Sequence, residues 1–180
     1  MSFTSLRAIV ENITIALQLE LSRDRKKYRA WLDGDQELKF GNAASQVHVD
    51  PRVAPIETHL VGRIGNDLFR QKHGAQRHGH VRELFSTLSK YAHAHPGYTD
   101  FDLWESSGPV FSARAFVEWA NAFAATYAFA VLALRLGLPG IRQLDGDYRT
   151  LKELFDAPVG LLAPRAPLRR ALRALPASIW

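Results

Sequence analysis

The chain has 180 residues, 47% of them hydrophobic, and carries 23 lysines and arginines against 18 aspartates and glutamates. This composition is typical of one folded domain with its own core, and it excludes an intrinsically disordered chain. The net charge of +5 fits a polyanionic partner, and the absence of cysteine excludes disulfides, thiolate metal sites and cysteine nucleophiles.

The beginning of the chain predicts a long amphipathic helix over residues 3–32. Apolar side chains recur there at intervals of three and four, from Leu6 through Val10 and Leu17 to Trp31. The first residues do not form a cationic segment followed by an apolar run, as a signal peptide would, so we expect a cytoplasmic protein. The second half of the helix is strongly basic, with Arg23, Arg25, Lys26, Lys27 and Arg29.

A loop is expected over residues 33–50, which begin with Asp-Gly-Asp and show no clear hydrophobic period. Pro51 and Pro55 suit the first turn of a following helix. Apolar residues at every fourth position extend that helix to about Arg70. The next helix is predicted over residues 80–93, where an apolar stripe lies beside a polar one.

A second loop, residues 94–110, contains Pro-Gly and Gly-Pro pairs. The most apolar stretch follows at residues 112–136. Its uncharged part is shorter than the ~20 residues needed to cross a bilayer, so we expect a buried central helix and no membrane span. Shorter helices are predicted over residues 145–155 and 165–175.

No segment alternates apolar and polar residues as a half-buried strand would. Nothing in the sequence marks a linker between domains, and residues 176–180 are expected to be a frayed tail. The prediction is therefore a single all-α domain over residues 1–180, a bundle of five or six helices.

The polar face of the predicted helix over residues 80–93 carries Arg82, Ser89 and His93, with Lys90 at its flank. An imidazole can transfer protons near neutral pH, and cations can hold phosphate oxygens. Together they are the minimum for phosphodiester cleavage without metal, with His93, Lys90 and Arg82 as candidate catalytic residues and Ser89 as a binding residue. Arg82 lies about 16 Å from His93 along the helix axis, whereas Ser89 and Lys90 lie within one turn of it. A solvated face that ends in a histidine favoured by the helix dipole is the alternative.

Further candidates flank this helix. Arg77 precedes it and is a candidate phosphate-binding residue. His95 and Trp104 follow it, in a loop expected to shape a pocket, and are candidate binding residues. The clustered histidines are His73, His78, His80, His93 and His95. With Asp100 or Asp102 they could form a zinc or nickel site, but their spacing matches no established metal motif, so we expect no metal and no cofactor.

The sequence "LSKYAHAHPG" at the end of this helix, in an all-α protein, resembles the HEPN superfamily of helical proteins found near bacterial defence and toxin–antitoxin systems. Residues 84–111 are also similar to a group of bacterial proteins of unknown function that share Leu-Ser, an aromatic residue, His, Pro-Gly and a Trp-x-Ser-x-Gly-Pro loop.

The HEPN resemblance implies a helical bundle, frequent homodimers and, in active members, a metal-independent ribonuclease site near the dimer seam. That site pairs an arginine with a histidine four to six residues later. Only His93 carries over here, because the interval before it contains no arginine: Lys90 is the nearest cation, Arg82 lies too early, and Arg77 directly precedes His78.

Two functions follow as hypotheses. The first is a metal-independent ribonuclease or nucleic-acid-acting effector of the bacterial defence or toxin type. The alternative is a non-catalytic helical module that binds nucleic acid, a nucleotide or a protein partner. The basic segments at residues 23–29 and 165–173 could bind phosphate backbones, so RNA or another polyanion is an expected partner, together with a second copy of the chain.

Overall fold

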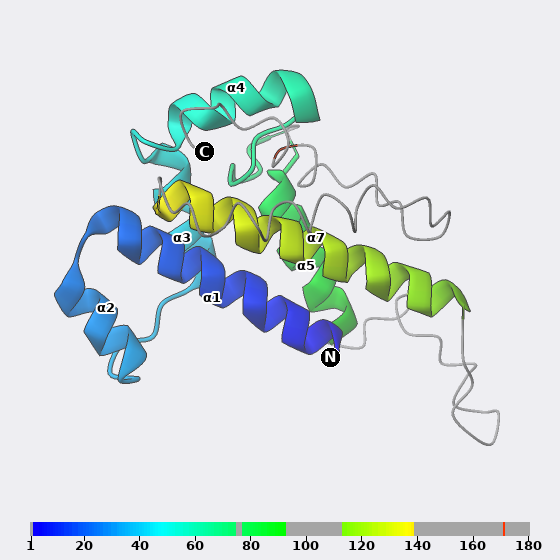
Figure 1. Cartoon of the computed structure of the whole chain (residues 1–180), viewed down its shortest axis with the longest axis horizontal. Coiled ribbons are helices and arrows are strands. Elements are labelled where there is room, and N and C mark those ends of the chain that lie inside the picture. The colour runs from blue at the N-terminus through cyan, green and yellow to red at the C-terminus, as the bar shows by residue number, and fades with distance from the viewer. Residues whose placement is uncertain (1, 75–76, 93–112, 139–170, 172–180) are drawn as a thin grey trace.

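A computed structural model describes residues 2–74, 77–92, 113–138 and 171 (Figure 1). These residues form six α-helices and no strand, which confirms the predicted all-α class. The helices are α1 (Phe3–Ser22), α2 (Arg25–Leu32), α3 (Phe40–Val49), α4 (Ala54–Ile64), α5 (His80–Ala92) and α7 (Ala113–Gly137). The loop at 94–110, the helices at 145–155 and 165–175 and the tail at 176–180 lie outside the described residues, apart from the buried Ala171.

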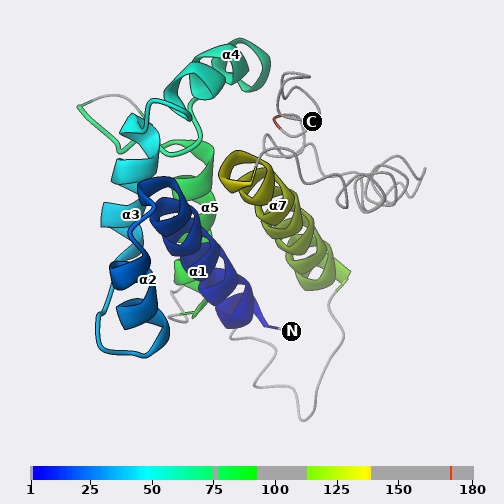
Figure 2. The same ribbon diagram turned by 60° about the vertical axis from the view of Figure 1, so that its left-hand side comes forward.

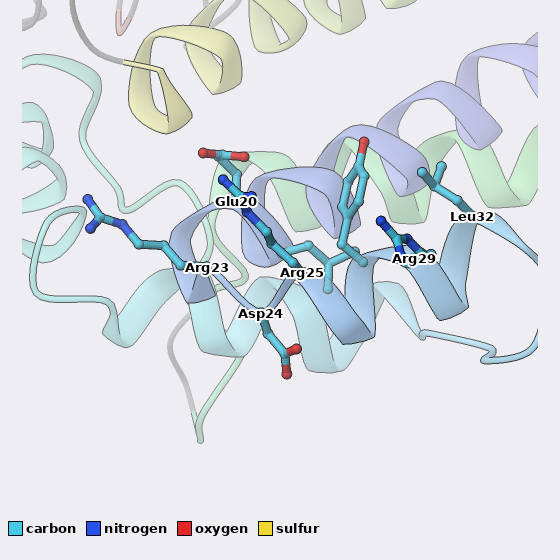
Figure 3. A pocket seen from close by; sticks show the side chains of 8 residues that line it. Glu20, Arg23, Asp24, Arg25, Arg29 and Leu32 are labelled. Atoms are coloured by element: carbon cyan, nitrogen blue, oxygen red, sulfur yellow. The ribbon is translucent and has the colours of Figure 1, made fainter.

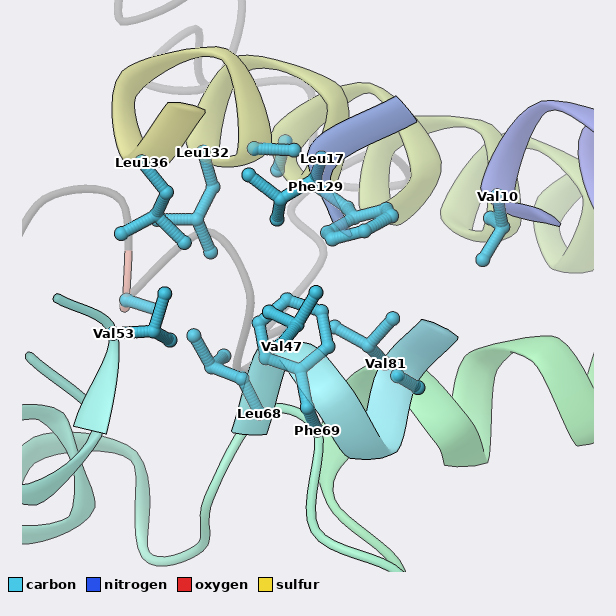
Figure 4. Packing of buried hydrophobic residues seen from close by; sticks show 14 of the residues in the cluster. Val10, Leu17, Val47, Val53, Leu68, Phe69, Val81, Phe129, Leu132 and Leu136 are labelled. Carbon is cyan, nitrogen blue, oxygen red and sulfur yellow. The ribbon is translucent and has the colours of Figure 1, made fainter. Parts of the chain in front are cut away.

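Helix α1 is the centre of the fold and packs against α3, α5 and α7. It runs beside α7, with α3 and α5 on its other side (Figures 1 and 2). The main core is drawn from all of these helices and from the segment after α4 (Figure 4). It includes Val10, Leu17, Val47, Leu68, Phe69, Val81, Phe129 and Leu132. Burial of each such side chain contributes roughly 1.5–3 kcal/mol to the free energy of folding. This core therefore holds the helices in their relative positions.

The single helix predicted over residues 3–32 is wrong, because the chain breaks between α1 and α2. Arg23 adopts the left-handed conformation, with φ of 54°, and its N–H donates to the Glu20 carbonyl. Asp24 then begins α2 by accepting a 2.9 Å hydrogen bond from the Lys27 N–H. The buried face of α1 ends at Leu21, and Trp31 of α2 packs back against the small cluster of Ile15, Leu19 and Ala43, so α2 turns instead of continuing α1.

The loop predicted over residues 33–50 is also wrong beyond residue 39, where α3 begins. Phe40, Ala43, Ala44 and Val47 are buried at helical spacing, on one face of α3. The Phe40 ring stacks on the Phe85 ring of α5, with centroids 3.9 Å apart. Ten residues with two alanines on the buried face give a weak hydrophobic signal, which is why the sequence shows no clear period there.

The other described helices follow the prediction more closely. Pro55 lies in the first turn of α4, as expected, but α4 ends at Ile64, before the expected Arg70. Gly65 terminates it in the left-handed conformation, with φ of 79°. Helices α5 and α7 match the predicted ranges over the part of the chain that the structure describes.

Helix α7 has a second property besides its place in the core. Within the described residues, Phe116–Gly137 is the one stretch long and apolar enough to cross a membrane, with a mean hydropathy of 1.4. A core helix passes the same test, and α7 places Phe129 and Leu132 in the core against α1 and α5. Length and composition therefore do not assign α7 to a bilayer.

Candidate functional site

Arg82, a candidate phosphate-binding residue, lies inside the protein, with 8% of its surface exposed. Its Nε donates to the Phe69 carbonyl at 2.6 Å. One Nη donates to the Gly41 carbonyl at 2.9 Å and to Ser45 Oγ at 2.7 Å. Burial lowers the pKa of Arg82 below that of a free guanidinium. The structure thus gives Arg82 an internal role, because it ties α5 to α3 and to the segment after α4.

Of the other predicted site residues, the structure describes Ser89, Lys90 and Arg77. Ser89 and Lys90 lie in its last turns, and Lys90 is exposed. Arg77 is exposed and precedes the other end of the helix. His93, His95 and Trp104 lie outside the described residues. The structure therefore brings Ser89 and Lys90 together and keeps Arg82 and Arg77 away from them.

Arg7 of α1 is a cation at this end of α5 that sequence reasoning missed. Its Nε donates to Ser89 Oγ at 3.1 Å, and Ser89 in turn donates to the Phe85 carbonyl at 2.8 Å. The Arg7 guanidinium also lies over the Phe85 ring, 4.9 Å from its centroid, and 3.7 Å from Glu11. The sequence indicates only the pair with Glu11, which lies four residues after Arg7. The contact with Ser89 depends on how α1 packs against α5.

Two aromatic residues and a carboxylate hold this end of α5 in place. The Tyr91 ring stacks on Phe3 of α1, with centroids 4.0 Å apart and an interplanar angle of 8°. The Tyr91 hydroxyl donates to Glu118 of α7 at 2.9 Å. Three helices therefore meet around Ser89 and Tyr91, so this corner is firmly positioned.

A buried carboxylate fixes the segment between α4 and α5. Glu57 is 2% exposed, and its Oε1 accepts the N–H groups of Leu68 and Phe69 at 2.7 and 2.8 Å. Its Oε2 lies 2.6 Å from His48 Nδ1. Glu57 thus satisfies two buried backbone donors and pairs with a histidine of α3, which is a structural arrangement.

The corner between α1 and α2 carries five cationic side chains within seven residues. Arg23, Arg25, Lys26 and Arg29 are exposed, and Lys27 is partly exposed. Three of them, Arg23, Arg25 and Arg29, line a hollow of about 790 Å³ (Figure 3). The hollow is lined by Leu19, Glu20, Arg23, Asp24, Arg25, Tyr28, Arg29 and Leu32. Asp24 turns away from the other labelled side chains, so Arg25 and Arg29 provide the charge along the α2 side (Figure 3).

An apolar groove of about 320 Å³ adjoins this hollow, between α1 and the end of α7. Its walls come from Ile13, Ala16, Leu17, Ala130, Ala133, Leu134, Gly137 and Leu138. Glu20 and Tyr28 line both the groove and the basic hollow. The stem of Glu20 packs on Gly137, where an added methyl group would lie 3.6 Å from Glu20 Cγ and 3.3 Å from Leu17 Cδ1. This close approach positions the Glu20 carboxylate at the junction of the two depressions.

The described residues contain no cluster of side chains suited to binding a metal ion. Among the described residues, no three His, Cys, Asp or Glu side chains gather where they could hold a metal ion. His93, His95, Asp100 and Asp102 are not among those residues.

Comparison of the chain with models of protein families, with curated proteins and with solved structures finds no match. Function is therefore inferred from the geometry of the described residues.

Proposed function

We propose that this protein binds nucleic acid, with RNA as its expected ligand, at the corner between α1 and α2. The observation that carries the proposal is the set of five cationic side chains between residues 23 and 29, four of them exposed. Three of the five, Arg23, Arg25 and Arg29, line one hollow. Closely spaced cations bind a phosphate backbone by releasing its condensed counterions. The left-handed turn at Arg23 supports the proposal, because it bends the basic segment around the hollow instead of extending it along one straight helix.

The test replaces two of these cations. In an Arg25→Gln/Arg29→Gln variant, RNA affinity measured by fluorescence anisotropy should fall by about tenfold or more, since each lost phosphate contact removes part of the counterion-release free energy. The matched control is Arg63→Gln/Lys72→Gln, which removes the same charge from two exposed positions elsewhere. Equal affinity of the two variants would reject the α1–α2 corner as the binding surface.

A second candidate function, metal-independent RNA cleavage, is favoured by the hydrogen bond from Arg7 to Ser89. Ser89 precedes His93 by four residues, so Arg7 would supply from α1 the arginine that the HEPN pattern places just before its histidine. We therefore extend the proposal to a HEPN-like arrangement of the bundle. In it, Arg7 of α1 would take the catalytic place of the arginine that the HEPN pattern puts before its histidine.

Cleavage is tested with purified protein and RNA in EDTA. His93→Ala should abolish cleavage, and Arg7→Ala should reduce it by roughly 100-fold, the effect expected from losing one charge-stabilising donor. Arg63→Ala, at an exposed position of α4, serves as the control. Cleavage that persists in His93→Ala would reject this second function and leave the binding proposal untouched.

A homodimer is part of the proposal, with the first half of α7 as its interface. Phe116, Phe123 and Tyr127 are 48%, 40% and 41% exposed. They form a ladder with Trp119, in which successive ring centroids lie 6.2, 5.4 and 6.2 Å apart. Exposed aromatic surface of this kind is typical of interfaces. The ladder adjoins Glu118, so a second copy would lie next to the Arg7–Ser89 corner.

Light scattering after size-exclusion chromatography tests the dimer. We also propose a cytoplasmic location, which cell fractionation tests. We expect a dimer for the wild type and a monomer for Phe123→Glu, because the new charge would lose its hydration at the interface. A monomeric wild type would reject the dimer. Recovery of the wild type with membranes would instead assign the aromatic face of α7 to lipid.

A further inference from the structure

The basic hollow and the apolar groove are neighbouring depressions of different chemistry, and Tyr28 and Glu20 line both of them. We propose that an unpaired nucleotide of a single strand binds across them, with its phosphates on the cations and its base in the groove against Tyr28. This inference rests on the proposed nucleic-acid binding at the same corner, and it adds which form of nucleic acid is selected.

Charge orients the nucleotide. Arg25 and Arg29 are four residues apart on α2, so they lie on one face of the helix beside the hollow. The Glu20 carboxylate lies at the junction with the groove and repels a phosphate there. Phosphates are therefore held on the α2 side, and the neutral base is the part that enters the groove.

Shape and surface chemistry suit a base. The groove volume of about 320 Å³ lies within the range of about 300–1,000 Å³ typical of small-molecule sites. Its walls are mainly alanine, leucine and isoleucine side chains, which offer an apolar surface to the flat face of a base. Tyr28 adds an aromatic ring that is 40% exposed, and aromatic rings stack on all four bases.

Trp31 supports the orientation of Tyr28. The two ring centroids lie 6.1 Å apart, tilted by 57°. Contacts between aromatic rings at this distance stabilise the pair. A duplex keeps its bases inside the stack and can offer only phosphates to the corner, so the two depressions together should prefer single strands.

The experiment measures binding of the 180-residue chain to a single-stranded RNA, to a duplex RNA of equal length and to a single strand with one abasic position. Wild-type protein should bind the intact single strand most tightly. Tyr28→Ala should weaken single-strand binding by about 5- to 150-fold, as expected for loss of one stacked base, and leave duplex binding within about twofold. Tyr28→Phe keeps the ring and should bind like the wild type.

The outcomes separate this inference from the proposed function. If Tyr28→Ala binds the single strand as well as the wild type does, the base site is rejected, while loss of affinity in Arg25→Gln/Arg29→Gln would still support the binding surface. If the wild type binds neither RNA at low salt, both proposals fail. Should Tyr28→Ala fail to fold, the wild type decides: equal affinity for the intact and abasic strands would overturn the inference.

Discussion

The guanidinium group of Arg82 connects three segments from inside the protein. Its planar fork donates to two carbonyl groups and one hydroxyl, on the segment after α4 and on α3. A lysine has a single point of charge on a flexible stem and cannot reproduce this geometry. Arg82→Lys should therefore leave a buried carbonyl without its donor.

We expect Arg82→Lys to lower the free energy of unfolding by about 2–3 kcal/mol, measured by urea denaturation. The control, Arg63→Lys at an exposed position, should change it by less than about 0.5 kcal/mol. If Arg82→Lys were as stable as this control and lost only RNA affinity, Arg82 would be a phosphate-binding residue and not a structural one.

Asp50 and Arg52 form a local pair that depends on pH. Arg52 donates to Asp50 through its backbone N–H and through two guanidinium nitrogens, at 2.9–3.0 Å, and it also donates to the Leu21 carbonyl of α1. The side-chain hydrogen bonds from Arg52 lower the pKa of Asp50 below the 3.8 of a free aspartate. Because the folded state has the lower pKa, this contribution to stability is present above about pH 4 and is lost as pH falls through the folded pKa.

Asp50→Asn should therefore be less stable than the wild type by roughly 0.5–1 kcal/mol at neutral pH, a size limited by the exposure of Arg52. The difference should shrink as the pH falls below about 4, which urea denaturation at several pH values can follow. Asp35→Asn, at an exposed loop position, controls for the loss of one negative charge. A wild-type advantage that stays constant down to low pH would contradict the assigned role of the Asp50 carboxylate.

At the scale of the elements, the segment joining α4 to α5 depends on a close backbone approach at Gly79. A side-chain carbon at this position would lie 2.5 Å from the Leu68 carbonyl oxygen and 2.8 Å from the Arg70 nitrogen. The chain is held there by backbone hydrogen bonds from Gly79 to Arg70 and from Val81 to Leu68, at 2.8 and 2.9 Å. To make room for a side chain at position 79, the start of α5 would have to move away from Leu68 and Arg70, which would break these hydrogen bonds.

Gly79→Ala should lower the free energy of unfolding by at least about 2 kcal/mol, because overpacking against backbone atoms is not relieved by rotation of a side chain. Gly62 provides a control of opposite sign, since it lies in α4 with no atom within 4 Å of an added methyl group. Gly62→Ala should raise stability by about 0.5–1 kcal/mol through helix propensity. Thermal denaturation of both variants tests this, and a stable Gly79→Ala would contradict the close approach.

The sequence predicted those elements whose apolar residues recur over three or more turns, as in α1, α5 and α7. It did not predict the break at Arg23, because Tyr28 and Trp31 continue the spacing of α1 beyond the turn. It did not predict α3, whose buried face is short and holds small residues. Local pattern indicates that a helix forms, whereas the place where it ends depends on what the helix packs against.

The candidate sites show the same limit. The basic residues of α2 were visible as a run of charge, but the hollow that Arg25 and Arg29 line exists only because the chain turns at Arg23. The contact between Arg7 and Ser89 joins residues 82 positions apart and follows from the packing of α1 on α5. Conversely, Arg82 is an arginine and was therefore a candidate for binding phosphate. Its burial, which the sequence does not indicate, shows instead that it connects helices inside the protein.

At the scale of the whole molecule, the proposed binding site and the proposed cleavage site lie toward opposite ends of α1. The basic corner and the apolar groove lie at its C-terminal end, and the Arg7–Ser89 contact lies near its N-terminal end. Arg7 and Arg23 are sixteen residues apart, which corresponds to about 24 Å along a helix. A strand that reaches both regions would therefore have to extend over several nucleotides, so binding and cleavage can be separated by variants at either end.

The most direct test of the central claim is the dependence of RNA affinity on salt. If the five cations of the α1–α2 corner contact phosphates of a single strand, a plot of log affinity against log salt concentration should have a slope of about −3.5. Arg25→Gln/Arg29→Gln should reduce the size of that slope by about 1.4, and Arg63→Gln/Lys72→Gln should leave it unchanged. A flat response of the wild type, or the same slope in both variants, would contradict the account.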